Sequence, residues 1–552
     1  MPDPVRITPL GGLGEVGKNM TVFERGGRLV LLDAGLSFPH SEMFGIDLVL
    51  PDFQYLRDRA DRVEGVVLTH GHEDHVGSLP YLLREIYPLP IYATRLTLGL
   101  IRGKLEEHGV VDRAVPHEVE PGTEVTLGPF VIRFHRVTHS IPDGVSIAID
   151  TPFGVLLHSG DFKLDQTPID GRVTDLRGIA AEATKGVHLF LSDSTNAEDS
   201  GFTPSERTVG PVLFDIIRDA DQLVVVACFA SHIHRIQQVV DAAVAAGRKV
   251  AFLGRSMHQS VAAAGPLGYL HIPEDTVVLI EDVAKMDPSD VVVCSTGSQG
   301  EPFSALTLMA AREHKWVKLK PGDTVILSSS VIPGNTTAIY RTLDGLYRTG
   351  AKVHHVAISP VHVSGHASAE ELKFMLNLIR PRWFIPVHGE LRHLAHHADL
   401  AREVGIPDDR ILICEDGDTV ILGEKLERGE RVQAGMTFVD GLGIGDVGQA
   451  VLRDRRKLAG DGIVVVVVTV DQHGGELLAG PDIINRGFVF DESSEELLAE
   501  ARHRVVMSLK ECATEGISDQ TVLNQHIRRA LGRYFFEVTQ RKPVIVPVIM
   551  EV

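Results

Sequence analysis

His70-Gly71-His72-Glu73-Asp74-His75 is the stretch that decides the fold, because it gathers four metal-ligand side chains in one short segment. It directly follows residues 65–69, an apolar run typical of a buried strand, and it precedes a helical run that starts near Ser78. Neutral imidazoles and carboxylates are the ligands that Zn²⁺ and Mn²⁺ accept. A helix cap needs only one acceptor, so three histidines here indicate a metal site instead.

The spacing of these ligands predicts two metal ions. Four side chains this close cannot all converge on one ion that also takes ligands from elsewhere in the chain. His70 and His72 therefore suit one ion, while Asp74 and His75 suit an adjacent one.

Further ligands are expected where later strands end. His139 follows the predicted strand 130–137, and Asp161 follows the strand 155–159. Asp161 is the natural bridge between two ions, because a carboxylate offers two oxygens. His388 closes the strand 383–388 and would complete the second metal site.

The pattern of predicted secondary structure changes along the chain. The first 190 or so residues alternate strands with loops and short helices, whereas residues 200–355 repeat strand–helix units typical of a mostly parallel sheet. Residues 430–460, with glycines and the charged stretch 453–457, are expected to form a linker or hinge. The last 90 or so residues predict a small α+β domain in the order β-β-α-α-β.

These motifs resemble those of a known fold. The order of the histidine motif, His139 and Asp161 resembles the ligand order of the metallo-β-lactamase fold. Leu32-Asp33-Ala34-Gly35 resembles that fold's first motif, in which the aspartate supports the ligand loop. The long gap before His388 resembles the inserted domain of the β-CASP branch, which processes nucleic acids, and Asp193, His366 and His388 match its signatures.

The resemblance implies an α/β chain built as a metallo-β-lactamase αββα sandwich with an inserted β-CASP βαβ domain and a small C-terminal α+β domain. The expected division is residues 1–197 and 356–440 for the two parts of the sandwich, 198–355 for the insertion, 441–460 for a linker and 461–552 for the C-terminal domain.

Three longer stretches resemble the ribonuclease J family within that branch. They are residues 11–20 (GGLGEVGKNM), 229–235 (FASHIHR) and 296–302 (TGSQGEP), and the C-terminal domain resembles that family too. His232 departs from the family pattern, which more often has Asn there. The glycines of residues 12–17 also fit a dinucleotide-binding string, but a strand follows them where a Rossmann loop must open a helix, so we expect no such cofactor.

The resemblance implies a metal-dependent ribonuclease in RNA maturation and decay, with 5′-to-3′ exonuclease and endonuclease activity on single-stranded RNA and a preference for 5′-monophosphate ends. Two metal ions, Zn or Mn, activate water for attack and stabilise charge on the phosphoryl oxygens, and the products keep 5′ phosphates. Asp74 is a ligand, a proton acceptor or both, and His366 is expected to contact the scissile phosphate or protonate the leaving oxygen.

Two loops are expected to hold the substrate phosphate, with hydroxyl groups, backbone amides and a glycine that permits close approach. Their residues are Ser231, His232, Ile233, His362, Val363, Ser364, Gly365 and His366. A plain turn before a capped helix is the alternative. Gly45, Asp47 and Asp446 resemble positions where some relatives hold a structural calcium, although ordinary loop turns would explain them as well.

The composition of the chain limits the class of protein and the cellular compartment that we expect. The chain has 552 residues, 44% of them hydrophobic, and a net charge of −20, which argues mildly against a general nucleic-acid coat. Its longest aliphatic run, residues 463–468, is far short of a membrane span. Four scattered cysteines without a CxxC, and a start without a basic-then-apolar pattern, predict a reduced, cytoplasmic protein. The resemblance implies a homodimer or tetramer and partners in an RNA-decay complex.

Other functions remain open on the sequence alone. A β-CASP nuclease acting on DNA is the nearest alternative, because no motif reports a contact to the 2′-hydroxyl. A hydrolase of a small ester is more distant, since the inserted domain argues against it. A non-catalytic subunit of an RNA-decay assembly is disfavoured by the complete ligand set.

Overall fold

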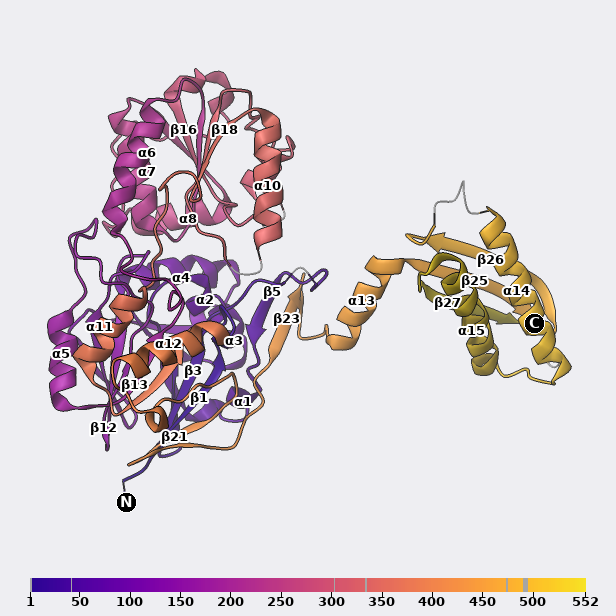
Figure 1. Cartoon of the computed structure of the whole chain (residues 1–552), viewed down its shortest axis with the longest axis horizontal. Coiled ribbons are helices and arrows are strands. Elements are labelled where there is room, and N and C mark those ends of the chain that lie inside the picture. Colours follow the sequence, from indigo (N-terminus) through magenta and orange to yellow (C-terminus); the bar gives the residue numbers. More distant parts are fainter. Residues whose placement is uncertain (1, 41, 302, 333–334, 473–474, 490–494) are drawn as a thin grey trace. The chain divides into compact units, whose positions relative to one another are not determined.

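A computed structural model of the chain describes residues 2–552 apart from residues 41, 302, 333–334, 473–474 and 490–494 (Figure 1). Pro302, in the motif 296–302, therefore lies outside the described residues. The chain forms two compact units, Met1–Phe38 with Leu48–Thr437 and Pro39–Asp47 with Phe438–Val552.

Two mixed β-sheets stack face to face in the larger unit. The first has the strand order β22-β21-β1-β3-β4-β6-β7-β8, and the second has the order β19-β13-β12-β11-β10-β9. Apolar side chains such as Phe23, Ile132 and Leu156 alternate inward and fill the space between the sheets. The strands are β1 (Val5–Gly11), β3 (Met20–Arg25), β4 (Arg28–Leu32), β6 (Val63–Val67), β7 (Leu89–Ala93), β8 (Ala114–Glu118), β21 (Val420–Leu422) and β22 (Leu426–Arg428), then β9 (Glu124–Leu127), β10 (Phe130–Arg136), β11 (Val145–Thr151), β12 (Gly154–His158), β13 (Val187–Asp193) and β19 (Trp383–Val387).

Helices cover the sandwich and complete the predicted αββα arrangement, which is confirmed. Phe190 and Phe384 on the second sheet pack in one apolar cluster with Leu372 and Met375 of α11. Helix α4 packs beside α3 and against β8 of the first sheet. The helices are α1 (Gln54–Arg57), α2 (Glu73–Val76), α3 (Leu79–Glu85), α4 (Arg95–Glu107), α5 (Leu176–Lys185), α11 (Ala369–Ile379) and α12 (Leu391–Glu403).

A separate parallel sheet lies between β13 and β19 in the sequence, with the order β15-β16-β14-β17-β18. Its strands are buried on both faces: Val224 and Val226 contribute to one apolar cluster, and Val225 and Ala227 to another. Figure 1 shows α6 and α7 on one side of this sheet and α10 on the other. The elements are α6 (Val209–Arg218), β14 (Val224–Ala227), α7 (Ile233–Ala245), β15 (Lys249–Leu253), α8 (Arg255–Ala264), β16 (Val291–Ser295), α9 (Ala305–Ala310), β17 (Thr324–Leu327), α10 (Thr336–Thr349) and β18 (Lys352–His355).

The smaller unit contains a three-stranded sheet with the order β26-β25-β27. Along β25 every second residue is buried, and Val466 and Val468 pack with Val505 and Ile527 of the helices. The order of elements is the predicted β-β-α-α-β, and the last part of the region expected as a linker or hinge forms helix α13. The elements are α13 (Gln449–Asp461), β25 (Ile463–Val470), β26 (Leu477–Arg486), α14 (Glu495–Thr514), α15 (Gln520–Thr539) and β27 (Val544–Glu551).

Helix α11 starts with a capping box, in which Ser368 and Glu371 exchange hydrogen bonds between side chain and backbone. The Glu371 carboxylate also accepts hydrogen bonds from the backbone amides of Leu164 and Thr203, so it ties three segments together. Cys228, Cys294, Cys414 and Cys512 are buried free thiols. Within the described part of the chain, no helix has both the length and the apolar character needed to cross a membrane.

The loop between β1 and β3, near the N-terminus, contacts segments from the late part of the larger unit. Its short strand β2 (Leu13–Gly14) pairs in parallel with β20 (Gly389–Glu390), and the Leu13 amide donates to Asp416 Oδ1 at 3.0 Å. Lys18 is 2% exposed, and its ammonium group pairs with Glu15 at 2.8 Å. This buried cluster of charges fixes the loop whose next residue, Asn19, enters the functional site.

Replacing Asp416 should change how stability depends on pH. Burial and the neighbouring Glu15 carboxylate raise the pKa of Asp416 to about 8, although Lys18 and the Leu13 amide oppose the shift. The folded chain then keeps a proton that the unfolded chain releases near pH 4, so the free energy of unfolding falls as the pH rises from about 4 to about 8. Asp416→Asn removes this titration. In thermal unfolding, its melting temperature relative to the parent should rise steadily across that window; a constant difference would contradict the prediction.

Candidate metal centre

Three histidine nitrogens converge at the edge of the sandwich. His72 Nδ1 lies 2.9 Å from His70 Nε2 and 3.1 Å from His139 Nε2. His139 Nδ1–H donates to the Gly365 carbonyl at 2.7 Å, which leaves its Nε2 with a lone pair. Burial lowers the pKa of His72 to about 4 and the pKa values of His70 and His139 well below the usual range. All three rings are therefore neutral, the form in which imidazole binds a metal.

A second group of ligand atoms lies next to the first. Asp74 Oδ2 is 3.6 Å from His75 Nε2 and 3.4 Å from His388 Nε2. Asp161 Oδ2 is 3.2 Å from His75 Nε2 and 3.5 Å from His388 Nε2. These four residues form a cluster whose candidate ligand atoms are all close enough to share one ion.

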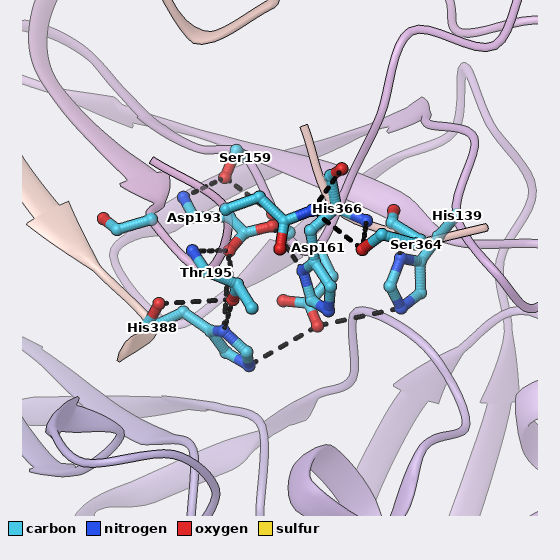
Figure 2. A network of polar contacts seen from close by, with 12 residues as sticks. His139, Ser159, Asp161, Asp193, Thr195, Ser364, His366 and His388 are labelled. Atoms are coloured by element: carbon cyan, nitrogen blue, oxygen red, sulfur yellow. Dashed lines mark hydrogen bonds and ion pairs between the residues drawn. The ribbon is translucent and has the colours of Figure 1, made fainter. Parts of the chain in front are cut away.

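The Asp161 carboxylate stands between the two groups. The same Oδ2 atom is 3.7 Å from His70 Nε2 and 3.8 Å from His139 Nε2, besides its contacts in the second group. Figure 2 shows Asp161 between His139 and His388. The donor set of buried imidazoles around a shared carboxylate fits two adjacent divalent ions, and nitrogen with carboxylate oxygen suits zinc or manganese.

Asp33 orients the first ligand loop. It follows β4 with a left-handed backbone, at φ 62°. Its carboxylate accepts hydrogen bonds from the Thr69 amide at 2.8 Å and from His75 Nδ1 at 2.8 Å. Thr69 Oγ1, which also donates to Asp33, lies 3.0 Å from His70 Nδ1. Both imidazoles are thus held with Nε2 free to bind metal, the usual arrangement around a ligating histidine.

Asp193 plays a comparable part for the late ligands. Its Oδ2 lies 2.7 Å from His366 Nδ1, and its Oδ1 accepts from the Thr195 amide at 2.9 Å. Thr195 Oγ1 in turn contacts His388 Nδ1 at 2.7 Å, as Figure 2 shows. His388 also has a left-handed backbone, at φ 58°, so these contacts hold a strained residue in place.

Sequence reasoning did not single out three residues that shape the centre. The Asn19 side chain donates to the Asp74 carbonyl at 3.0 Å and lies 3.2 Å from His75 Nε2. A Cβ on Gly35 would lie 1.6 Å from the same Asp74 carbonyl, so only glycine fits there. Thr195 orients His388. Asn19 and Gly35 belong to motifs already quoted for the resemblance, and Thr195 lies two residues after the signature residue Asp193; these positions were the available signal.

The two predicted phosphate loops meet beside the metal ligands. In the loop 362–366, Gly365 approaches His139 so closely that a Cβ would lie 2.8 Å from the ring, and Ser364 Oγ accepts from Asn196 at 2.8 Å. Arg235 joins the two loops, because it follows 231–233 closely in the sequence and its buried guanidinium donates to the Val361 carbonyl at 2.8 Å.

The surroundings of His232 do not favour a direct contact between its ring and a phosphate. Its ring is 1% exposed, and its Nε2 lies 3.3 Å from the Glu206 carboxylate. Burial lowers the pKa of His232 to about 4, so the imidazole is neutral. Any contact that this segment makes to a phosphate therefore falls to Ser231 and to backbone amides.

The predicted calcium residues lie in the smaller unit. Asp47 Oδ2 accepts from the Gly441 amide at 2.8 Å, and Asp446 lies beside Gly443. The Arg455 guanidinium lies against Gly45 and donates to the Phe44 carbonyl at 2.9 Å. A calcium ion at Gly45, Asp47 and Asp446 stays a prediction.

The fold and the donor set together define a metallo-hydrolase of the metallo-β-lactamase superfamily with a β-CASP insertion. Four family models match the chain: the metallo-β-lactamase superfamily at residues 13–198, the ribonuclease J β-CASP domain at 221–346, the Zn-dependent metallo-hydrolase RNA specificity domain at 351–409, and the ribonuclease J C-terminal domain at 450–552.

Curated relatives match over nearly the whole chain. Ribonuclease J 1 of Streptococcus pyogenes is 43% identical over 550 residues, covering 100% of this chain and 98% of the relative. Ribonuclease J2 of Bacillus subtilis is 42% identical, covering 99% of each. Ribonuclease J of Thermus thermophilus is 44% identical, covering 100% of this chain and 96% of the relative. The chain belongs to the ribonuclease J family, which confirms the resemblance drawn from its motifs.

A solved structure shares the fold at low sequence identity. The crystal structure of a protein of unknown function from Enterococcus faecalis aligns with a TM-score of 0.52 at 15% identity, covering 76% of this chain and 100% of that one. This likeness concerns the fold alone.

Removing the Asp33 carboxylate should weaken metal binding. Asp33→Asn keeps the shape of the side chain but loses the charged acceptor for His75 Nδ1, and such orienting partners contribute about 10- to 100-fold to metal affinity. Metal content after dialysis against graded chelator measures the effect. Asp112→Asn, at an exposed position, is the control. Equal metal retention by the two variants would refute the orienting role.

Proposed function

We propose that this chain is a metal-dependent ribonuclease that degrades single-stranded RNA from 5′-monophosphate ends in the 5′-to-3′ direction and also cleaves RNA internally. The observation that carries the proposal is the contact between the loop 362–366 and His139, because it puts a candidate phosphate-binding loop directly on a metal ligand. Membership of the ribonuclease J family along the whole chain supports RNA as the substrate.

The ligand residues would hold two divalent ions, zinc or manganese. His70, His72 and His139 suit one ion, while Asp74, His75 and His388 suit the other, with Asp161 shared between them. When bound, such ions lower the pKa of water and stabilise negative charge on phosphoryl oxygens. Hydrolysis joins the water oxygen to phosphorus and releases the 3′ oxygen, so the downstream product keeps its 5′ phosphate.

The chain's own groups position the substrate. Ser364 and the backbone of Gly365 face the side on which His139 lies, and Ser231 comes from the insertion. Asp193 fixes the His366 ring through Nδ1, which presents Nε2 for the phosphate or for the leaving oxygen. Asp74 accepts a proton or binds metal, and these roles are compatible because a carboxylate has two oxygens.

A cleavage ladder tests the proposal. The substrate is a 3′-labelled single-stranded RNA with a 5′ monophosphate, run beside the same RNA with a 5′ hydroxyl and beside DNA of the same sequence, with added Mn²⁺. We expect stepwise shortening of the monophosphorylated RNA, slower shortening of the hydroxyl form, and loss of all cleavage with chelator. Faster shortening of DNA would place the chain among DNA-processing nucleases, and no cleavage would favour a non-catalytic subunit.

The His366 imidazole gives a second test. His366→Ala should lower the cleavage rate by about 100-fold or more, the size expected for a group that moves a proton in the transition state. Metal content should stay that of the parent if the ions sit in the groups of His70, His72 and His139 and of Asp74, His75, Asp161 and His388; His366 also forms a possible ion-binding group with Asp161, Asp193 and His388, and a loss of metal would make it a ligand instead. Single-turnover kinetics with metal analysis on the same sample measure both quantities. A full rate with intact metal would remove His366 from the mechanism.

A homodimer through the C-terminal domain is part of the proposal. One face of its sheet packs on α14 and α15, while the other carries apolar side chains that remain open to solvent. Ile484, Val548 and Met550 are 51%, 41% and 49% exposed. A second copy of the chain, which carries the same apolar face, is the partner that such a surface fits. Reduced cysteines support a cytoplasmic setting, where RNA-decay partners would meet it.

A further inference from the structure

A second pocket adjoins the metal centre. Its interior has room for about one water molecule or one hydroxyl group, and His139 is part of its wall. Arg136, at the end of β10, and His234, in the first turn of α7, line it together with Glu206 and Asp170. The pocket thus lies between the sandwich and the insertion, within the larger unit.

Three polar atoms in this wall are buried without a hydrogen-bond partner: Arg136 Nε, Glu206 Oε2 and His234 Nε2. Glu206 is 3% exposed and His234 is 8% exposed. The other Glu206 oxygen is held by Arg235 at 2.6 Å, and the Asp170 carboxylate lies 3.8 Å from His234 Nε2, too far for a hydrogen bond. Unpaired buried polar groups are costly and rare, so three in one pocket indicate that a polar ligand satisfies them.

The charges select the kind of ligand. Burial alone would raise the pKa of Glu206, but the Arg235 guanidinium paired with it holds that pKa well below the usual range, so the group is a carboxylate that repels phosphate. A metal ion is disfavoured by the Arg136 guanidinium. Among the described residues, the clusters able to hold an ion gather at the candidate metal centre and include neither Glu206, His234 nor Asp170. What remains is a neutral group that both donates and accepts hydrogen bonds, as a hydroxyl does.

We propose that this pocket receives the 2′-hydroxyl of the ribose next to the scissile phosphate, where Glu206 and His234 contact it, and thereby favours RNA over DNA. The inference rests on the proposed function. A ribose is bonded directly to the phosphate that the metal ligands would address, and the shared residue His139 puts the pocket within that reach. The Glu206 carboxylate accepts from the hydroxyl, and His234 Nε2 donates to it or accepts from it.

A cycle that combines protein and substrate changes tests this contact. The enzyme forms are the full chain and His234→Ala, with His396→Ala, an exposed histidine on α12, as the matched control. The substrates are 5′-monophosphorylated RNAs that are either unmodified or carry a single 2′-deoxy nucleotide on one side or the other of the scissile phosphate. Single-turnover rates, melting temperatures and metal content are measured for each form.

We expect His234→Ala to slow cleavage of unmodified RNA by about 3- to 10-fold, the range of one hydrogen bond. One of the 2′-deoxy substitutions should slow the parent enzyme by a similar factor but leave the variant unaffected, because both changes remove the same contact. His234→Gln, which keeps a polar group near the same place, should recover part of the loss, and His396→Ala should behave as the parent does.

Independent, multiplying losses would overturn the ribose pocket while leaving the proposed ribonuclease intact. The ribose pocket is equally overturned if no 2′-deoxy substitution slows the parent, or if His234→Ala acts only by lowering the melting temperature or the metal content. A parent enzyme that cleaves no RNA at all would instead overturn the proposed function, and the ribose pocket with it.

Discussion

The Asp161 carboxylate is the point on which the centre depends, because one oxygen atom faces four histidines that come from three separate parts of the chain. Burial holds the pKa values of His70 and His139 well below the usual range, whereas for His75 and His388 burial is outweighed by Asp161 and the other carboxylates nearby, which raise the pKa. Imidazoles gathered this closely around one carboxylate fit a bound cation. The surrounding strands hold the candidate ligands in this arrangement. The ends of β6, β10, β12 and β19 bring the ligands to one edge of the sandwich, and the close packing of the two sheets fixes where those ends lie.

The surroundings act as a rigid frame for these ligands. Asp33 and Asp193 each accept hydrogen bonds from a ligand loop and from an imidazole, and Asn19 holds the Asp74 backbone. Asp33 and His388 keep backbone angles that non-glycine residues rarely adopt. Strain of this kind persists only where several contacts over-determine the position, and at this site hydrogen bonds supply them.

The sequence predicted which candidate ligands lie together, because neighbours in a motif are also neighbours in space. The spacing of His70 to His75 already implied two ions, and the strand ends pointed to His139 and Asp161. The repeated strand–helix units of residues 200–355 predicted the parallel sheet. Contacts between residues that are distant in the sequence could not be predicted, since no local pattern indicates them. Thr195 contacts His388, which is 193 residues away, and Glu371 contacts Leu164, which is 207 residues away. Residues 449–461 form a helix where a linker was expected. Leu452 is the one buried residue of this helix, and the Ala, Leu, Arg and Lys residues of the stretch are good helix formers, so local propensity explains it.

The position of the inserted domain in the sequence affects when the candidate metal centre can form during synthesis. Strand β19, which carries His388 at its end, pairs in parallel with β13, yet the whole parallel domain is translated between them. A ribosome that has passed β13 has produced most of the sandwich and every residue of the first two ligand groups except His388, which closes the second group. Since synthesis runs from the N-terminus and domains fold as they emerge, the nascent chain stays an incomplete nuclease while it is still tethered beside its own messenger RNA. The order of the segments thus delays the hydrolytic centre until the domain that would guide RNA into it already exists.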